Sequence, residues 1–224
     1  MATKGKSAAA YVMAMDIHHF SKLSVSDHDK IIDHIYGEIG GILKQAGDGL
    51  LDKKTIGDGF VFYFSSAAAA VDTAIKVQSL FKADYIWTRD NFEVKSSCRI
   101  ALHFGEFFWF DDKIEGRRAL FGRNIIVAAR LEPVVRANEI WCTRAFKEES
   151  GLAGLDKKIS FHPLGKCELA KSWSEQEVFA IYDPKKDKRP TDLPKEREEI
   201  EPDNQSTKVA YPFAYFALKQ AISR

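Results

Sequence analysis

The sequence predicts an α+β fold, with a mostly antiparallel sheet and helices on one face, for three reasons. Short apolar runs of strand length are interspersed with longer segments of helical periodicity. Two of the short runs flank the tripeptide Gly57-Asp58-Gly59, which is typical of an antiparallel hairpin. The chain has 224 residues, 45% of them hydrophobic, and is therefore long enough to bury the core of one domain of ordinary size.

The first predicted elements are a short strand and a long helix. Residues 10–16 form a compact apolar run that leads into a polar break, so we expect a buried strand with Asp16 at its carboxyl end. Ser26 and Asp27 can cap the helix that follows, and glycine at position 47 stops it. The apolar positions of this helix recur at helical spacing: Ile31, Ile32, Ile35, Ile39, Ile42 and Leu43.

The next predicted elements are a hairpin and a second helix. Residues 50–56 and 60–64 are expected to be its two strands, with Asp58 at or beside the tip. A serine pair at 65–66 can cap a helix that continues through Phe81. The second helix is therefore expected to begin directly after the hairpin.

A strand-like segment over residues 94–110 completes the order strand, helix, hairpin, helix, strand. That βαββαβ order is the ferredoxin-like pattern, in which the helices gather on one face of the sheet. Residues 122–135 predict a further helix, with an apolar face made by Ile125, Ile126, Ala129, Leu131 and Val135.

Composition divides the chain into four parts. Residues 1–10 are expected to be a flexible N-terminus, and residues 11–182 to be the folded domain. Residues 183–208 are rich in charge and proline, which is typical of a solvated linker. Residues 209–224 are rich in aromatic side chains, and we expect them to pack on the domain or on a partner copy, or else to contact a membrane surface or an effector.

The charge and cysteine content exclude several classes of protein. Lys and Arg number 33 against 32 Asp and Glu, so the formal net charge of +1 creates no global attraction for nucleic acid. The three cysteines lack any C-x-x-C pairing and indicate neither a disulfide framework nor a zinc site. With no apolar stretch of transmembrane length, the sequence predicts a cytoplasmic location.

Four segments, in order, resemble the catalytic domain of class III nucleotidyl cyclases, the fold of adenylate and guanylate cyclases. The segments lie between Tyr11 and Tyr182 and are Asp16-Ile-His-His-Phe-Ser, Lys54-Thr-Ile-Gly-Asp-Gly-Phe, Arg99-Ile-Ala-Leu-His-Phe-Gly-Glu and Phe121-Gly-Arg-Asn-Ile-Ile-Val-Ala-Ala-Arg-Leu-Glu. The resemblance implies a homodimer with shared sites that cyclises a nucleoside triphosphate.

The resemblance also implies a metal site. The two metal-binding aspartates of the family fall on Asp16 and Asp58, with Ile17 beside them, and together they are expected to hold two Mg²⁺ or Mn²⁺ ions. The turn that follows can supply backbone N–H groups to the β- and γ-phosphates, and it contains His18, His19, Phe20 and Ser21.

Two cationic positions of the family lie later in the chain. The arginine that steadies the charge at the transferring phosphorus, contributed to the site by the partner subunit, corresponds to Arg130. The phosphate-binding lysine corresponds to Lys171, one step beyond the best register. Both residues are assigned only by their motif positions, because an isolated helical arginine is usually a surface ion-pair partner.

The base-reading positions of the family fall on Lys54 and Ala119. An aspartate at the second position suits adenine, because it accepts from the exocyclic amine, and Ala119 removes that acceptor. Lys54 can still donate to a carbonyl, which favours uracil. The sequence therefore predicts conversion of UTP to cyclic UMP, as in the bacterial pyrimidine cyclases of Pycsar anti-phage systems, in which a separate effector reads the product.

One departure leaves other functions open. The family places a ribose-positioning asparagine four residues before the arginine, where this chain has Ile126, and Asn124 lies two residues earlier. Either Asn124 takes over that role, ribose orientation is relaxed, or the domain is a catalytically silent nucleotide-binding module. An adenylate or cytidylate cyclase with an unusual base pocket is the other alternative.

Overall fold

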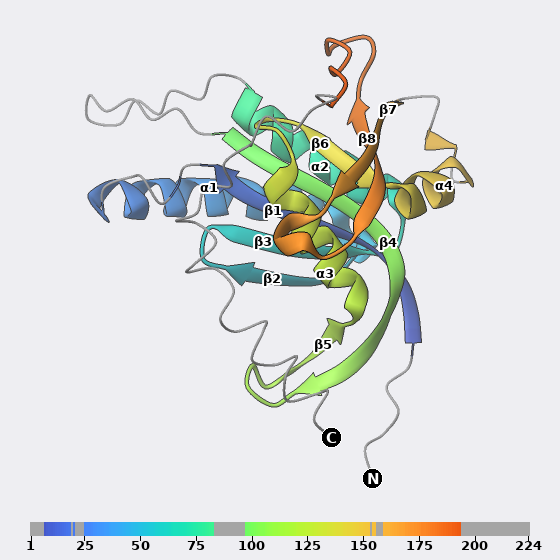
Figure 1. The fold of residues 1–224 in the computed structure, drawn as a ribbon. Helices are drawn as coiled ribbons and strands as arrows, with labels where there is room; N and C mark the ends of the chain where they lie inside the picture. Colours follow the sequence, from blue (N-terminus) through green and yellow to red (C-terminus); the bar gives the residue numbers. More distant parts are fainter. Residues whose placement is uncertain are drawn as a thin grey trace.

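A computed structural model describes residues 7–18, 20, 25–82, 97–152, 154–155 and 159–193 (Figure 1). Its elements follow the order β1 (Ser7–His18), α1 (Val25–Ala46), η2 (Gly47–Gly49), β2 (Leu50–Ile56), β3 (Gly59–Phe64), α2 (Ala67–Lys82), β4 (Ser97–Asp112), β5 (Arg117–Phe121), α3 (Arg123–Leu131), η3 (Glu132–Val134), β6 (Ile140–Thr143), α4 (Arg144–Leu152), β7 (Ser160–Glu168), η5 (Ala170–Ser172) and β8 (Glu175–Tyr182). The predicted βαββαβ order is confirmed by β1 through β4.

Within the described residues, these strands form one sheet. Seven of them follow the order β2-β3-β1-β4-β6-β8-β7, and β5 pairs with β4 outside that path. All neighbours are antiparallel except β4 and β6, which run parallel. The predicted mostly antiparallel α+β fold is therefore confirmed.

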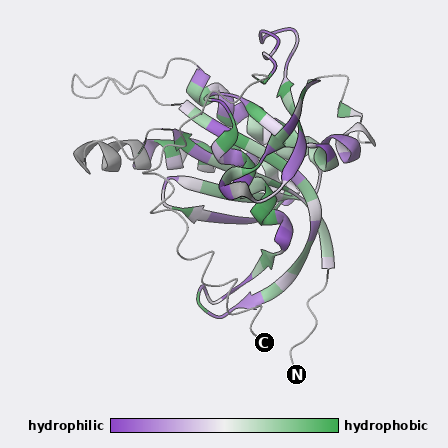
Figure 2. Cartoon of the chain, in the orientation of Figure 1, coloured by the Kyte–Doolittle hydropathy of each residue, from purple (hydrophilic) through white to green (hydrophobic). Residues whose placement is uncertain are grey.

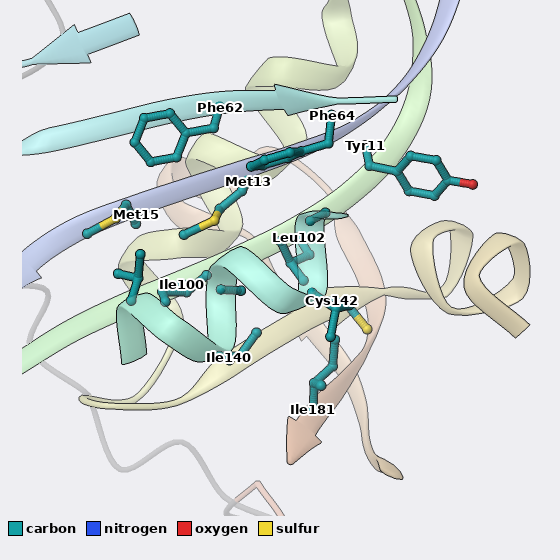
Figure 3. Close-up of a cluster of buried hydrophobic side chains, with 14 of the residues drawn as sticks. Tyr11, Met13, Met15, Phe62, Phe64, Ile100, Leu102, Ile140, Cys142 and Ile181 are labelled. Atoms are coloured by element: carbon teal, nitrogen blue, oxygen red, sulfur yellow. The ribbon is translucent and has the colours of Figure 1, made fainter. Parts of the chain in front are cut away.

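One face of the sheet carries the larger hydrophobic core. Its side chains come from alternate positions of the central strands, because successive residues of a strand point to opposite faces. Figure 3 shows ten of them labelled: Tyr11, Met13, Met15, Phe62, Phe64, Ile100, Leu102, Ile140, Cys142 and Ile181. Buried residues of α1, α2 and α4 pack against them, so the two helices of the βαββαβ core lie on one face as expected.

Helix α3 packs on the opposite face. Its buried Ala128 joins alanines and valines of β1 and β3, and Leu131 joins a neighbouring cluster over β6 and β8. The helix ends at Leu131, four residues earlier than the sequence pattern predicted, because Pro133 cannot continue it and η3 follows. This second face also receives the side chains of Asp16 and Arg99, whose strands share that register.

Strand β4 is the longest in the sheet and bends strongly along its length (Figure 1). Its first part pairs with the whole of β1, and its end forms a hairpin with β5 through the register Phe110↔Ala119. Figure 1 shows that the bend carries this hairpin beneath β2. Sequence periodicity did not anticipate β5, or the strands and helix that follow α3.

The segment after β8 contacts the domain although its composition is that of a linker. Figure 2 shows this loop as largely hydrophilic. Nevertheless, Arg136 donates to the carbonyls of Thr191 and Asp192, and the Asp192 carboxylate accepts from the buried His162. Packed contacts of the domain thus extend to Leu193, while the predicted aromatic segment 209–224 lies outside the described residues.

None of the helices described by the structure combines the length and the apolar character needed to cross a membrane.

Candidate active site

Asp16 and Asp58 lie next to each other at one end of the sheet. Asp16 of β1 pairs with Gly59 of β3, and Gly59 directly follows Asp58 in the hairpin turn. A Cβ atom placed on Gly59 would lie 3.8 Å from Oδ1 of Asp16. The turn itself depends on Gly57, whose φ of +65° favours glycine. Strand register and turn chemistry together bring the two predicted carboxylates to one place.

Tyr36 of α1 supports the turn that carries Asp58. Its hydroxyl donates to the Gly57 carbonyl at 2.7 Å, and its ring lies 4.9 Å from that of Phe60, centroid to centroid. Burial, followed by the nearby Asp58 charge, raises the pKa of Tyr36 and keeps its hydroxyl a donor. Sequence reasoning did not select Tyr36, because it looked like one more residue of an amphipathic helix.

Arg99 is the cation that contacts Asp16. Its Nη2 lies 2.8 Å from Oδ2 of Asp16, and its Nε lies 2.8 Å from Oε1 of Glu132. The three side chains are only 11%, 16% and 5% exposed, respectively. A buried arginine thus bridges a predicted metal ligand and a second carboxylate that the sequence had not marked as functional.

The electrostatics of this cluster favour a bound cation. Burial, followed by the charge of Asp58, raises the pKa of Asp16 to about 7, against the opposing effect of Arg99. Burial, followed by the charge of Asp16, raises the pKa of Glu132 to about 8. Carboxylates outnumber the guanidinium, so a divalent cation would relieve repulsion that Arg99 balances only in part.

The donor set fits Mg²⁺ or Mn²⁺, which prefer carboxylate oxygens. In the part of the chain that the structure describes, no group of three or more His, Cys, Asp or Glu side chains forms a metal site. Any ion held by Asp16 and Asp58 would need further ligands, for which backbone oxygens, water and phosphate are suitable. The Ile17 side chain is 1% exposed, so only its backbone, which donates to the Asp16 carboxylate, belongs to the site.

The predicted phosphate turn is described only in part. His18 ends β1, and its Nδ1 lies 3.3 Å from the Ser97 hydroxyl. Phe20 packs at the edge of the larger core. His19 and Ser21 lie outside the described residues, so their proposed contacts with phosphate stay predictions.

Arg130 and Lys171 meet at the 3-10 turn before β8. Arg130 Nη1 donates to the Ala170 carbonyl at 3.0 Å, and its guanidinium lies 4.7 Å from the ring of Trp173. Lys171, the next residue after Ala170, is exposed and has a φ of +63°. The structure therefore places the two predicted phosphate-binding cations of one chain at the same turn, with Arg130 over the Trp173 ring.

Asn124 uses its side chain inside the fold. Its Oδ1 lies 3.2 Å from Nε2 of His103, and its Nδ2 donates to the Glu106 carbonyl at 2.8 Å. A Cβ atom on Gly105 would approach Asn124 to 2.3 Å, so the amide fills the place of a missing side chain. These contacts anchor the start of α3 on β4.

His103 completes that anchor. Its Nδ1 lies 2.8 Å from the Thr143 hydroxyl, and burial lowers its pKa, so it stays neutral at physiological pH. Its Nε2 then donates to Asn124, so the contacts of this histidine are those of a structural residue.

The base-reading positions Lys54 and Ala119 meet at Phe110. Ala119 is the cross-strand partner of Phe110 and is fully buried. The Lys54 ammonium lies 5.7 Å from the centroid of the Phe110 ring. The two positions therefore share one neighbour, although sequence reasoning had not selected Phe110.

This architecture is that of the catalytic domains of adenylyl and guanylyl cyclases. The structure resembles the guanylate cyclase domain of RhGC from Catenaria anguillulae in complex with GTP (TM-score 0.65, 18% identity, 80% of this chain and 98% of that one). It also resembles the adenylyl cyclase CyaB from P. aeruginosa (TM-score 0.64, 16% identity, 86% and 100%). A dimeric guanylyl cyclase domain of RhoGC from Blastocladiella emersonii matches with a TM-score of 0.64 and 18% identity over 80% and 98%.

No family model matches this sequence, and no curated protein matches it. At these identities the solved structures establish the fold, and the chemistry has to be argued from the side chains.

Proposed function

We propose that this chain is a metal-dependent nucleotidyl cyclase that converts a nucleoside triphosphate to its 3′,5′-cyclic monophosphate and pyrophosphate. The observation that carries the proposal is the adjacency of Asp16 and Asp58 at the end of β1 and in the β2–β3 turn, backed by the buried Arg99. Two hard-cation ligands beside an arginine suit a triphosphate better than they suit a purely structural turn.

The reaction needs the ribose 3′-oxygen to attack the α-phosphorus while the bond from that phosphorus to the pyrophosphate oxygen breaks. Bound Mg²⁺ or Mn²⁺ would lower the pKa of the 3′-hydroxyl and neutralise the triphosphate. Asp16 and Asp58 would hold two such ions. An ion pair with Glu132 holds Arg99 in place, and Arg99 keeps the Asp16 carboxylate oriented toward the two ions.

We also propose a homodimer with shared sites, and the positions of the cations support it. Arg130 and Lys171 lie together at η5, whereas Arg99 is the cation that contacts Asp16. In the proposed dimer, Arg130 and Lys171 of one subunit face the metal pair of the other and steady the phosphates. The exposed Phe108 and Ile114 of the β4–β5 hairpin, 42% and 96% exposed, suit burial in such an interface.

UTP is the proposed substrate. Lys54 offers a donor for a base carbonyl, and the buried Ala119 offers no acceptor for an exocyclic amine, a difference worth roughly 1–3 kcal/mol. Cyclic UMP would then serve as a signal in bacterial anti-phage defence, read by a separate effector in the cytoplasm. An adenylate or cytidylate cyclase with an unusual base pocket is the competing specificity.

The test is a product analysis with purified protein, Mn²⁺ or Mg²⁺, and ATP, GTP, CTP or UTP in separate reactions. Mass spectrometry should detect cyclic UMP with wild type and none with Asp16→Ala. Asp72→Ala, an exposed acidic residue of α2, is the matched control and should keep full activity. A different cyclic nucleotide would keep the enzyme and overturn the base assignment.

A second candidate is a silent nucleotide-binding module. Ile126 cannot hydrogen-bond, and Asn124 is already engaged by His103 and Glu106, so the described contacts provide no evident ribose-positioning amide. Binding of all four triphosphates by a folded dimer that makes no cyclic product would select this candidate.

A further inference from the structure

Phe110 occupies the place where the two base-reading positions meet. It lies in the last part of β4, partly exposed, with the Phe121 ring 5.7 Å away in an edge-to-face arrangement. The Lys54 ammonium lies over its ring, 5.7 Å from the centroid. A cation over an aromatic face is attracted by the negative charge of that face, and the partial exposure of Phe110 leaves part of its side chain open to solvent.

Ala119 is not accessible to a ligand in this arrangement. Its exposure is 0%, and it faces the same side of the β4–β5 hairpin as its partner Phe110. A base that approaches this region therefore meets the Phe110 ring and Lys54 before it can reach position 119.

The buried carboxylate of Asp52 fixes the distance between β2, which carries Lys54, and the β4–β5 hairpin, which carries Phe110. Asp52 of β2 accepts hydrogen bonds from Arg117 and from the backbone N–H of Leu120 at 2.8 Å, both in β5. Arg117 also donates to the Lys53 carbonyl at 3.0 Å. These bonds hold β5 against β2, so Lys54 and the Phe110 ring are positioned before any ligand arrives.

We propose that Phe110 is a base-binding residue on which the nucleobase stacks while Lys54 donates to a carbonyl on the base edge. When the base binds, it would displace the Lys54 ammonium from the face of the Phe110 ring. The displaced ammonium would then donate a hydrogen bond to the edge of the base. Stacking on an aromatic ring accepts any base, so discrimination falls to Lys54, which favours bases with an accessible carbonyl, such as uracil. The inference rests on the proposed function.

The experiment measures binding rather than turnover. Isothermal titration with Mn²⁺ compares α,β-methylene-UTP, which cannot release pyrophosphate, with inorganic tripolyphosphate, which has no base. Phe110→Leu should weaken binding of the nucleotide by roughly 5- to 100-fold and leave tripolyphosphate binding unchanged. Phe110→Tyr, which keeps the ring, should restore nucleotide affinity. With UTP as substrate, Phe110→Leu should raise KM and leave kcat nearly unchanged.

Phe104→Leu is the matched control, because Phe104 lies in the same strand but outside the β4–β5 pairing, and its ring contacts Tyr11. Equal nucleotide affinity in wild type and Phe110→Leu would overturn the inference, as would wild-type affinity no greater for the nucleotide than for tripolyphosphate. If binding depends on Phe110 but no triphosphate is cyclised, the proposed function fails and the stacking site stands. If Phe110→Leu does not fold, Lys54→Met decides in its place, since it should selectively weaken nucleotide binding.

Discussion

The two halves of the candidate site are built in different ways. At the aspartate end, adjacent strands fix the central groups: Asp16 pairs with Gly59 on one side and with Arg99 on the other. At the base end, β4 bends toward β2, and side-chain bonds of Asp52 and Arg117 hold β5 against β2. The aspartate end is therefore built on the backbone pairing of the sheet, whereas the base end depends on a few side-chain bonds.

This difference indicates which part of the candidate site can tolerate amino-acid substitutions. Metal binding and phosphate chemistry need fixed distances, which paired central strands supply. Base recognition differs among nucleotides, and a hairpin held to β2 by a few side-chain bonds can change without disturbing the sheet.

Asp58→Ala should remove the proposed chemistry at the rigid end. The metal ions would lower the free energy of the transition state by several kcal/mol. Their loss in this variant should therefore reduce cyclase activity on the order of 10³-fold or more. Initial rates of cyclic nucleotide formation measure this, and the melting temperature should change little, because Asp58 lies in a turn. Retention of most activity would remove the metal assignment.

Arg99→Met should destabilise the fold as well as the site. It leaves Asp16 and Glu132 buried without their common cation, at a cost of about 3 kcal/mol. Urea unfolding at pH 7 measures the loss. The double variant Arg99→Met with Glu132→Gln should recover part of it, and a single variant as stable as wild type would contradict the buried triad.

Asp52→Asn should affect the base end alone. The amide can still accept from Leu120 but loses the ion pair with Arg117, so we expect a loss of roughly 1–2 kcal/mol in stability. KM for the nucleotide should rise while tripolyphosphate affinity stays at the wild-type value. Equal weakening of both ligands would show that the two ends are not independent.

The stability of the metal-free protein should fall as pH rises. The pKa of Glu132 is about 8 in the folded chain and is near its ordinary value when unfolded, so between about pH 4.5 and 8 the folded state binds more protons. Glu132 should contribute at most about 1.4 kcal/mol per pH unit to the slope, and Asp16, whose pKa is raised to about 7, adds to the slope below pH 7. Urea titrations from pH 5 to 8.5 measure the total, and Glu132→Gln should reduce the slope, most clearly between pH 7 and 8; an identical slope in that variant would exclude Glu132 as a cause.

The sequence was most informative where periodicity and turn residues agree. The βαββαβ core followed from helical spacing and from the Gly57-Asp58-Gly59 turn. Arg99 could have been found from register, because an antiparallel neighbour of β1 has to place some residue opposite Asp16, and Arg99 begins the strand-like motif.

The other features of the fold and of the candidate site depend on tertiary contacts, which no local sequence pattern encodes. Ala119 is fully buried although it lies in the short strand β5, and Asn124 has the same sequence neighbours whether it faces a nucleotide or Gly105. The strands after α3 are short apolar runs, which cannot be distinguished from loops or helix fragments by period alone.

Gly105 and Asn124 together restrict how this chain can evolve. The amide of Asn124 occupies the space that a side chain at position 105 would need, and it also bonds to His103. An alanine at 105 therefore requires the Asn124 amide to move or to be replaced by a smaller side chain, and either change gives up the present link to His103. Neither change is favourable alone, so among natural variants of this protein we expect the two positions to covary.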